Sequence, residues 1–140
     1  MSVFIAQSES EIDSCFDVMS ELRPALKREE FAPRVRRQQQ QGYVLAGLEV
    51  DGEIVCAAGF RMLENLAWGR FLYVDDLVTA ENRRSEGHGD EMLTWLIDYA
   101  KQHHRDELHL DSGVQRFGAH RFYLRRRMDI TNHHFSMKLT

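Results

Sequence analysis

The chain has 140 residues, of which 43% are hydrophobic, and it carries a formal net charge of −4 at pH 7. This length and composition predict one folded domain, residues 1–140. The acidic balance offers no basic field for nucleic acid or anionic lipid, and it mildly favours a cationic small substrate. No apolar run approaches the roughly 20 residues of a membrane span, and the first residues lack the features of a signal peptide. We therefore expect a cytoplasmic protein with no membrane or nucleic-acid partner.

The N-terminal region predicts a strand followed by two helical segments. Residues 3–5 form a short apolar run of β-formers. Ser8 and Glu11 have the spacing of a capping box, ahead of apolar residues at helical spacing that continue to Leu22. A second, charged segment, residues 25–41, is bracketed or interrupted by two prolines and ends before a glycine, as helices often do.

The remainder of the chain begins as a hairpin and then alternates strand with helix. Two β-rich runs, residues 43–50 and 53–60, flank Asp51-Gly52, which is a strong hairpin signal. The pattern then predicts a strand, a helix, a strand, a helix and a final strand or hairpin arm, over residues 70–79, 88–103, 107–111, 115–127 and 130–139. The order β-α-α-β-β-β-α-β-α-β predicts an α/β fold with a mixed sheet and helices on both faces.

The cysteines and histidines point away from disulfides and metals. Cys15 lies on a predicted helix face and Cys56 in a predicted strand, with no Cys-x-x-Cys spacing, so we expect two reduced core residues. The seven histidines include two adjacent pairs. Neighbouring residues rarely bind one ion, and no His-Glu-x-x-His motif accompanies the pairs. The sequence therefore predicts no metal site.

The turn after the fourth predicted strand carries the clearest chemical signal. It contains Arg84, Gly87 and Gly89 and leads directly into a predicted helix. A helix N-terminus presents backbone N–H groups and a partial positive charge, which suit a diphosphate. The glycines would let phosphate oxygens approach the main chain, and the arginine could add charge-assisted bonds. Gly-x-Gly alone also fits an ordinary strand–helix turn; it is neither a P-loop nor a dinucleotide-binding fingerprint.

With the arginine three residues before the first glycine, the turn resembles the CoA-binding signature of the GNAT N-acetyltransferase superfamily, Arg/Gln-x-x-Gly-x-Gly/Ala. Arg84, Gly87 and Gly89 match it. The chain is also similar to the closing pattern of the family, Ala-x-x-x-Tyr, at Ala119 and Tyr123. The two matches lie in order at a family-like separation. The element order agrees with the fold of the family, a mixed, mostly antiparallel sheet flanked by helices on both faces.

The resemblance implies an N-acetyltransferase that uses acetyl-CoA as its co-substrate. The CoA diphosphate would be bound by the turn, which consists of Arg84, Ser85, Glu86, Gly87, His88 and Gly89. Main-chain groups at the strand end, those of Leu77, Val78 and Thr79, would hold the pantetheine arm and polarise the thioester carbonyl. Tyr123 would act as the general acid that protonates the departing thiolate.

Asp75 and Asp76 are candidate acidic residues for the substrate amine. The run Tyr-Val-Asp-Asp resembles the Tyr-Leu-Glu-Asp strand of diamine and polyamine acetyltransferases, and Asp75 takes the place of the acidic residue proposed there as base. Because neighbours in a strand point to opposite faces, we expect at most one of the two in the cleft, with Asp75 favoured. Such a carboxylate could accept the ammonium proton or anchor the cation; otherwise the pair could lie at a strand edge or cap a helix.

We expect the acceptor to be a primary amine of a small molecule, polyamine-like or amino-acid-like. The same cofactor apparatus would serve a protein-lysine or N-terminal acetyltransferase, and a non-catalytic acyl-CoA-binding module is a third interpretation. Two departures from the family pattern bear on the substrate side: Arg116 replaces a frequent asparagine, and Arg127-Met128 replaces Gly-Phe. A homodimer is implied by the resemblance alone.

Overall fold

A computed structural model describes residues 2–140. The chain divides into two compact units, Met1–His109 and Leu110–Thr140. The elements of the first unit are β1 (Ser2–Ile5), α1 (Glu9–Ser14), α2 (Phe16–Leu22), α3 (Arg28–Gln39), β2 (Val44–Val50), β3 (Glu53–Asn65), β4 (Gly69–Thr79), the 3₁₀ turn η1 (Glu81–Arg83) and α4 (His88–Gln102). β5 (Glu107–Leu110) reaches the boundary, and α5 (Phe117–Arg125) belongs to the second unit. The expectation of one domain over residues 1–140 stays a prediction.

The strands form one sheet in the order β1-β2-β3-β4-β5. The pairs from β1 to β4 are all antiparallel, and β5 joins β4 after the α4 crossover. The predicted α/β fold with a mixed sheet is confirmed. The predicted hairpin is also confirmed, because β2 and β3 are joined at Asp51 and Gly52, which have φ values of 51° and 80°. Positive φ at both central residues is the requirement of the commonest two-residue hairpin turn.

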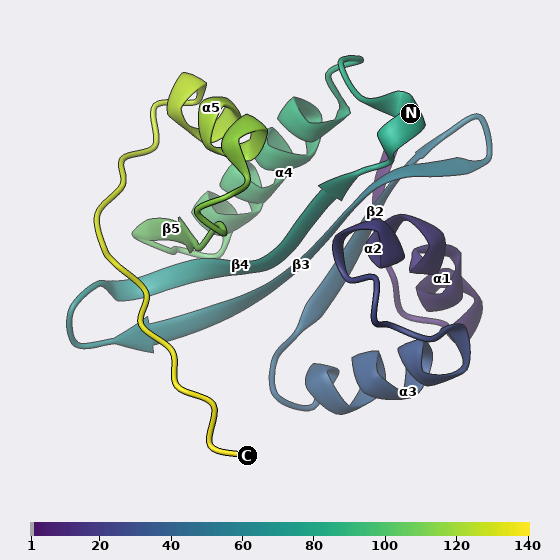
Figure 1. The fold of residues 1–140 in the computed structure, drawn as a ribbon, viewed down its shortest axis with the longest axis horizontal. Coiled ribbons are helices and arrows are strands. Elements are labelled where there is room, and N and C mark those ends of the chain that lie inside the picture. The colour runs from purple at the N-terminus through teal and green to yellow at the C-terminus, as the bar shows by residue number, and fades with distance from the viewer. Residues whose placement is uncertain (1) are drawn as a thin grey trace. The chain divides into compact units, whose positions relative to one another are not determined.

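Helices cover both faces of the sheet, as predicted. In Figure 1, α1, α2 and α3 lie on one side of β2, β3 and β4, and α4 lies on the other. Buried residues of the first face form one cluster, which includes Ile12, Met19, Phe31, Val35, Leu45, Ala57 and Val78. On the second face, Phe60 of β3 packs edge to face against Tyr99 of α4, with ring centroids 5.1 Å apart. The two apolar layers hold β3 and β4 in place between them.

The first helical segment has the predicted capping box but is divided in two. The Glu11 backbone N–H donates to Ser8 Oγ at 3.1 Å, and the Ser8 N–H donates to Glu11 Oε1 at 2.9 Å. The single helix predicted up to Leu22 is wrong, since α1 ends at Ser14 and α2 begins after Cys15. The Ser14 hydroxyl donates to the Glu11 carbonyl at 2.6 Å, and the Cys15 N–H donates to the Ile12 carbonyl. A side chain thus competes for the carbonyl that a continuous helix would use.

The second helical segment, α3, begins three residues later than predicted and runs through Pro33. Proline has no N–H and costs a hydrogen bond inside a helix. The helix persists because Phe31, Ala32 and Val35 are buried in the core cluster, so that tertiary packing outweighs the local preference.

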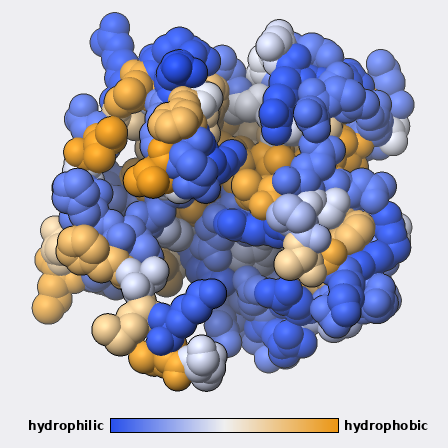
Figure 2. Space-filling model, in the orientation of Figure 1, coloured by the Kyte–Doolittle hydropathy of each residue, from blue (hydrophilic) through white to orange (hydrophobic). Residues whose placement is uncertain are grey.

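The strand predicted over residues 130–139 is wrong. Residues 128–140 form neither helix nor strand. Alternating apolar residues satisfy only half of what a strand needs, because its backbone must also pair with a neighbour, and no ladder within residues 2–140 includes this segment. Its apolar side chains, Ile130, Phe135, Met137 and Leu139, are exposed instead. Figure 2 shows hydrophobic atoms reaching an otherwise hydrophilic face in separate groups.

Both cysteines are free and buried, which confirms that they are core residues. Burial raises the pKa of each thiol to about 11. The Thr79 hydroxyl of β4 donates to Cys56 Sγ at 3.6 Å. At neutral pH both sulfurs therefore remain unreactive thiols.

Candidate active site

A β-bulge lies in the middle of β4. Gly59 of β3 pairs with Asp76, and the next residue of β3, Phe60, pairs with Val74. Asp75 is therefore an extra residue without an opposite number on β3. A bulge of this kind breaks the alternation of side chains between the two faces of a sheet.

The bulge brings both carboxylates of β4 to the same pocket. Asp75 Oδ2 accepts a hydrogen bond from Arg61 Nε at 3.0 Å, and the other end of the Arg61 guanidinium donates to Gln38 Oε1 on α3. Asp76 Oδ1 accepts from Arg23 Nε at 3.0 Å, and its Oδ2 accepts from the Tyr43 hydroxyl at 2.9 Å. The expectation that at most one of the pair faces the cleft is wrong, because it assumed an unbroken strand.

The pocket has a volume of about 690 Å³ and opens between β4 and the helices of the first face. Its wall combines apolar side chains, most of them from the helices and their connection, with polar side chains from both the helix side and the strand side. The residues that line it are Met19, Leu22, Arg23, Pro24, Ala25, Leu26, Phe31, Arg34, Val35, Gln38, Tyr43, Tyr73, Asp75 and Asp76. A cavity of a few hundred Å³ with a few convergent polar groups is the usual form of a small-molecule site.

Burial changes the proton affinity of two groups at this pocket. The pKa of Asp75 is raised, chiefly because the half-buried carboxylate has lost solvent, and the Arg61 guanidinium opposes part of the rise. The pKa of the buried Tyr43 hydroxyl lies well above its ordinary value, because burial and the neighbouring Asp76 carboxylate both disfavour a phenolate. Tyr43 is therefore a fixed hydrogen-bond donor to Asp76, whereas Asp75 is closer than an ordinary aspartate to exchanging a proton near neutral pH.

Tyr43 reaches Asp76 by lying over Gly59. A Cβ added at Gly59 would lie 1.8 Å from the Tyr43 hydroxyl oxygen and 2.3 Å from its ring carbon. The absence of a side chain at position 59 is thus what admits the tyrosine ring. No sequence motif marks this dependence, because the two residues meet only through strand pairing.

We expect Gly59→Ala to lower the free energy of unfolding by about 1–3 kcal/mol, the usual scale of overpacking. Gly118→Ala in α5 is the matched control, because a Cβ there meets no atom within 4 Å. That substitution should leave stability unchanged or raise it slightly. Denaturant unfolding of the two variants and the parent measures the difference; equal stability of all three would contradict the role given to Gly59.

The turn that follows β4 places its residues at the N-terminus of α4. Ser85 and Gly87 have φ values of 69° and 86°, and Gly87 is the N-cap of a helix of 15 residues. A Cβ at Gly87 would meet no atom within 4 Å, so the backbone there faces open space. Arg84 is exposed, and Gly89 lies in the first turn of the helix. The turn thus combines an accessible left-handed backbone with the positive end of a helix dipole.

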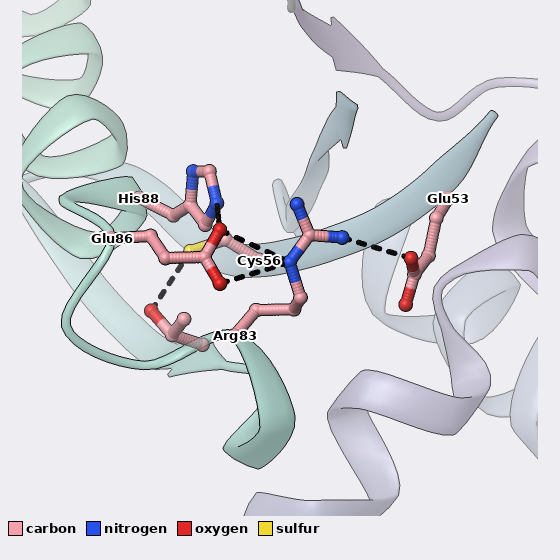
Figure 3. A network of polar contacts seen from close by, with 6 residues as sticks. Glu53, Cys56, Arg83, Glu86 and His88 are labelled. Atoms are coloured by element: carbon pink, nitrogen blue, oxygen red, sulfur yellow. Dashed lines mark hydrogen bonds and ion pairs between the residues drawn. The ribbon is translucent and has the colours of Figure 1, made fainter. Parts of the chain in front are cut away.

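Acidic and basic side chains of the same turn are already paired with one another (Figure 3). Arg83 Nη1 contacts Glu53 Oε2 at 2.9 Å, and Arg83 Nε donates to Glu86 at 3.2 Å. His88, which is buried, has its Nε2 3.2 Å from Glu86 Oε1. The pKa of Glu86 is lowered, first by the hydrogen bond from Arg83. These contacts fix the shape of the turn and hold the Glu86 carboxylate against two basic groups.

The other predicted site residues are divided between the two units. Leu77, Val78 and Thr79 form the end of β4, opposite Ala58, Ala57 and Cys56 of β3. They connect the Asp pair to the turn along one continuous stretch of chain. Tyr123 lies on α5 in the second unit, where its ring is 5.4 Å from that of Phe122. Its role as general acid stays a prediction.

The sequence did not indicate Arg23, Gln38, Tyr43 or Arg61, all of which contact the Asp pair or its partners. They come from four different segments and belong to no motif. The one related signal in the sequence is Gly59, whose missing side chain leaves room for the Tyr43 ring. That signal can be interpreted only once the register of β3 and β4 is known, because Gly59 lies opposite Asp76.

Neither metal-binding clusters nor membrane-spanning helices occur in the described chain. Within residues 2–140, no three His, Cys, Asp or Glu side chains gather where they could hold an ion. None of the helices in the same residues has the length and apolar character that crossing a bilayer requires.

Comparison with known proteins gives the family. The model of the acetyltransferase (GNAT) family matches residues 8–128. An uncharacterized N-acetyltransferase of Bacillus subtilis (strain 168), YhdJ, is 33% identical over 117 residues, which cover 83% of this chain and 82% of that protein. The chain belongs to the GNAT acetyltransferase family.

Solved structures share the fold at low sequence identity. A ribosomal-protein-alanine N-acetyltransferase from Brucella melitensis biovar Abortus 2308 superposes with a TM-score of 0.84 at 15% identity, covering 99% of this chain and all of that one. A glucosamine-6-phosphate N-acetyltransferase from Arabidopsis thaliana gives a TM-score of 0.76 at 19% identity and covers both chains completely. Because acceptors as different as these share the fold, the fold alone does not specify the acceptor.

Proposed function

We propose that the protein transfers an acetyl group from acetyl-CoA to a primary amine of a small molecule in the cytoplasm. The observation that carries this proposal is the bulge of β4, which turns Asp75 and Asp76 toward one pocket, while the same strand continues into a glycine turn at the start of α4. An acceptor site and a diphosphate site thus lie on one short stretch of chain.

The residues of the turn fit the diphosphate of CoA. Gly87 has a left-handed backbone that faces open space, and the dipole of α4 favours negative charge at that point. Arg84 is exposed and can reach a phosphate oxygen, whereas Arg83 is already bound to Glu53 and Glu86. We assign diphosphate binding to the main chain from Ser85 to Gly89, with Arg84 as the side-chain contribution.

Asp75 is the residue that we assign to the amine. The ammonium form of the acceptor must lose a proton before its nitrogen can attack the thioester carbonyl, form the C–N bond and release the C–S bond. The raised pKa of Asp75 makes this carboxylate a better proton acceptor than an ordinary aspartate. Asp76 is held by Tyr43 and Arg23 and fixes the shape of the strand beside it. We assign protonation of the departing thiolate to Tyr123.

The size and position of the pocket favour a small acceptor. A volume of about 690 Å³ lies within the range of drug-sized ligand sites. The segment Arg23–Leu26, between α2 and α3, forms part of its wall. A peptide would need an extended groove, whereas the acids here lie in a cavity lined by two helices and their connection.

We expect Gly87→Ala to weaken acetyl-CoA binding by about tenfold or more, because a side chain there strains the backbone and occupies the space of the phosphate. Gly52→Ala is the matched control. Gly52 also has positive φ, 80°, and no neighbour within 4 Å of its Cβ, but it lies in the hairpin turn. Both variants should lose similar stability, roughly 1 kcal/mol.

Calorimetric titration of acetyl-CoA into the parent and both variants tests the proposal. The parent and Gly52→Ala should bind alike, and a thiol-release assay with a panel of small amines should detect turnover. If the parent binds no acetyl-CoA, or if Gly87→Ala binds as tightly as the parent, the diphosphate site has been placed wrongly.

A further inference from the structure

Both carboxylates of the pocket already have a cationic partner. The Arg23 guanidinium lies 2.9 Å from Asp76 Oδ1, and the Arg61 guanidinium lies 3.0 Å from Asp75 Oδ2. Each pair is partly shielded from water, which lengthens the reach of its charges. An acceptor with several ammonium groups would therefore meet two guanidinium groups beside the acids.

One further cation faces the same pocket and has no partner in the described part of the chain. Arg34 lines the cavity from α3, and across residues 2–140 its guanidinium makes no salt bridge or hydrogen bond. Glu30, one helical turn earlier, does not pair with it. Arg34 is exposed, so that its side chain is free to reorient toward a ligand. The pocket thus contains an arginine whose charge is not neutralised by any group among residues 2–140.

The spacing along α3 relates Arg34 to the acids. Gln38 follows Arg34 by one turn on the same face of the helix, and its amide oxygen accepts a hydrogen bond from the Arg61 that binds Asp75. One turn of an α-helix rises about 5.4 Å. Through Gln38 and Arg61, the Arg34 position is thus connected to the Asp75 end of the same pocket. Leu22, Leu26 and Phe31 supply part of the apolar wall of the pocket.

We propose that the acceptor carries an anionic group, a carboxylate or a phosphate, in addition to its amine, and that Arg34 binds this group. A guanidinium recognises either anion through two parallel N–H donors, which a neutral or cationic acceptor would leave unused. This inference rests on the proposed acetyl transfer and narrows it: amino acids and amino phosphates fit the pocket, and polyamines do not. Arg34 is then a residue that determines specificity, and it takes no part in the chemistry.

The test uses pairs of small amines in which one member carries an anionic group and the other does not. 4-Aminobutyrate is compared with 1,4-diaminobutane, which has the same carbon chain, and O-phosphoethanolamine is compared with ethanolamine. In the parent protein, kcat/KM should be at least about tenfold higher for the anionic member of one pair. Which pair shows the difference identifies the anion as carboxylate or phosphate.

Arg34→Gln should lower kcat/KM for the anionic acceptor by about tenfold or more, mainly through KM, and leave the low rate with its cationic or neutral counterpart unchanged. Arg37→Gln is the matched control, because it removes the same charge from an exposed position of α3 that does not line the pocket. If kcat/KM is equal for the two members of each pair, or if Arg34→Gln and Arg37→Gln change it equally, the role given to Arg34 is wrong. Either result would leave the proposed acetyl transfer standing. A parent protein that releases no thiol with any of the amines would overturn the proposed function and this inference with it.

Discussion

Replacing Tyr123 with phenylalanine is expected to lower kcat by about 10²-fold or more and to leave the affinity for acetyl-CoA little changed. The departing thiolate needs a proton, and loss of a positioned general acid costs a factor of this size. The substitution removes one oxygen atom and keeps the ring that packs beside Phe122. Steady-state thiol release gives kcat, and calorimetry gives the affinity.

Tyr99→Phe is the control for this experiment. Tyr99 lies on α4, where its ring packs against Trp95 and His103, and it also loses only a hydroxyl group. Its kcat should match that of the parent. A Tyr123→Phe protein that turns over at the parent rate would remove Tyr123 from the mechanism and leave the thiolate to be protonated by solvent.

Asp75→Asn is expected to have a comparably large effect, about 10²-fold or more on kcat/KM, because the amide cannot accept the ammonium proton. The substitution should leave the fold intact, since the amide oxygen can still accept the hydrogen bond from Arg61. Burial raises the pKa of Asp75, so the uncharged acid is more favoured in the folded state than in the unfolded chain. The stability that this shift contributes is present below the unfolded-state pKa and is lost as pH rises through the folded-state pKa. An uncharged amide at this position is therefore compatible with folding at neutral pH.

The pH profile gives a second measurement on the same residue. A base must be ionised, so kcat/KM of the parent should fall as the pH is lowered through the raised pKa of Asp75, above the range of an ordinary aspartate. The residual activity of Asp75→Asn should lack this acidic limb. Asp98→Asn, on an exposed part of α4, is the control. It should keep the parent value of kcat/KM and the same decrease of kcat/KM at low pH. An unchanged profile in Asp75→Asn would leave Asp75 as an anchor at most.

Features that depend on neighbouring residues could be predicted from the sequence. The capping box of Ser8 and Glu11, the turn at Asp51 and Gly52, and the glycine turn before α4 all appear where their local patterns indicated. Each depends on a few consecutive residues with particular backbone preferences. The family could also be identified, since its signature lies in one such turn.

Features that depend on pairing or packing could not be predicted. The bulge at Asp75 arises from the register between two strands, and neither strand alone encodes it. The partners Arg23 and Arg61 reach the acids from distant segments, so no spacing connects them. The final strand failed for the same reason, since alternation predicts a strand but does not supply the neighbour with which it must pair.

The extra residue in β4 makes the acid pair depend on the length of the strand as well as on its composition. Deleting one residue between Val74 and Leu77 would restore perfect alternation, and the two halves of β4 could then pair with β3 without interruption. Such a deletion would make the pairing of β3 with β4 regular. It would also separate the two positions of the acid pair, so that they no longer face one pocket. In related chains, acids aligned with Asp75 and Asp76 would therefore indicate the same acid pair only if β4 has the same length. The number of residues between the β3–β4 hairpin and the glycine turn must also be equal.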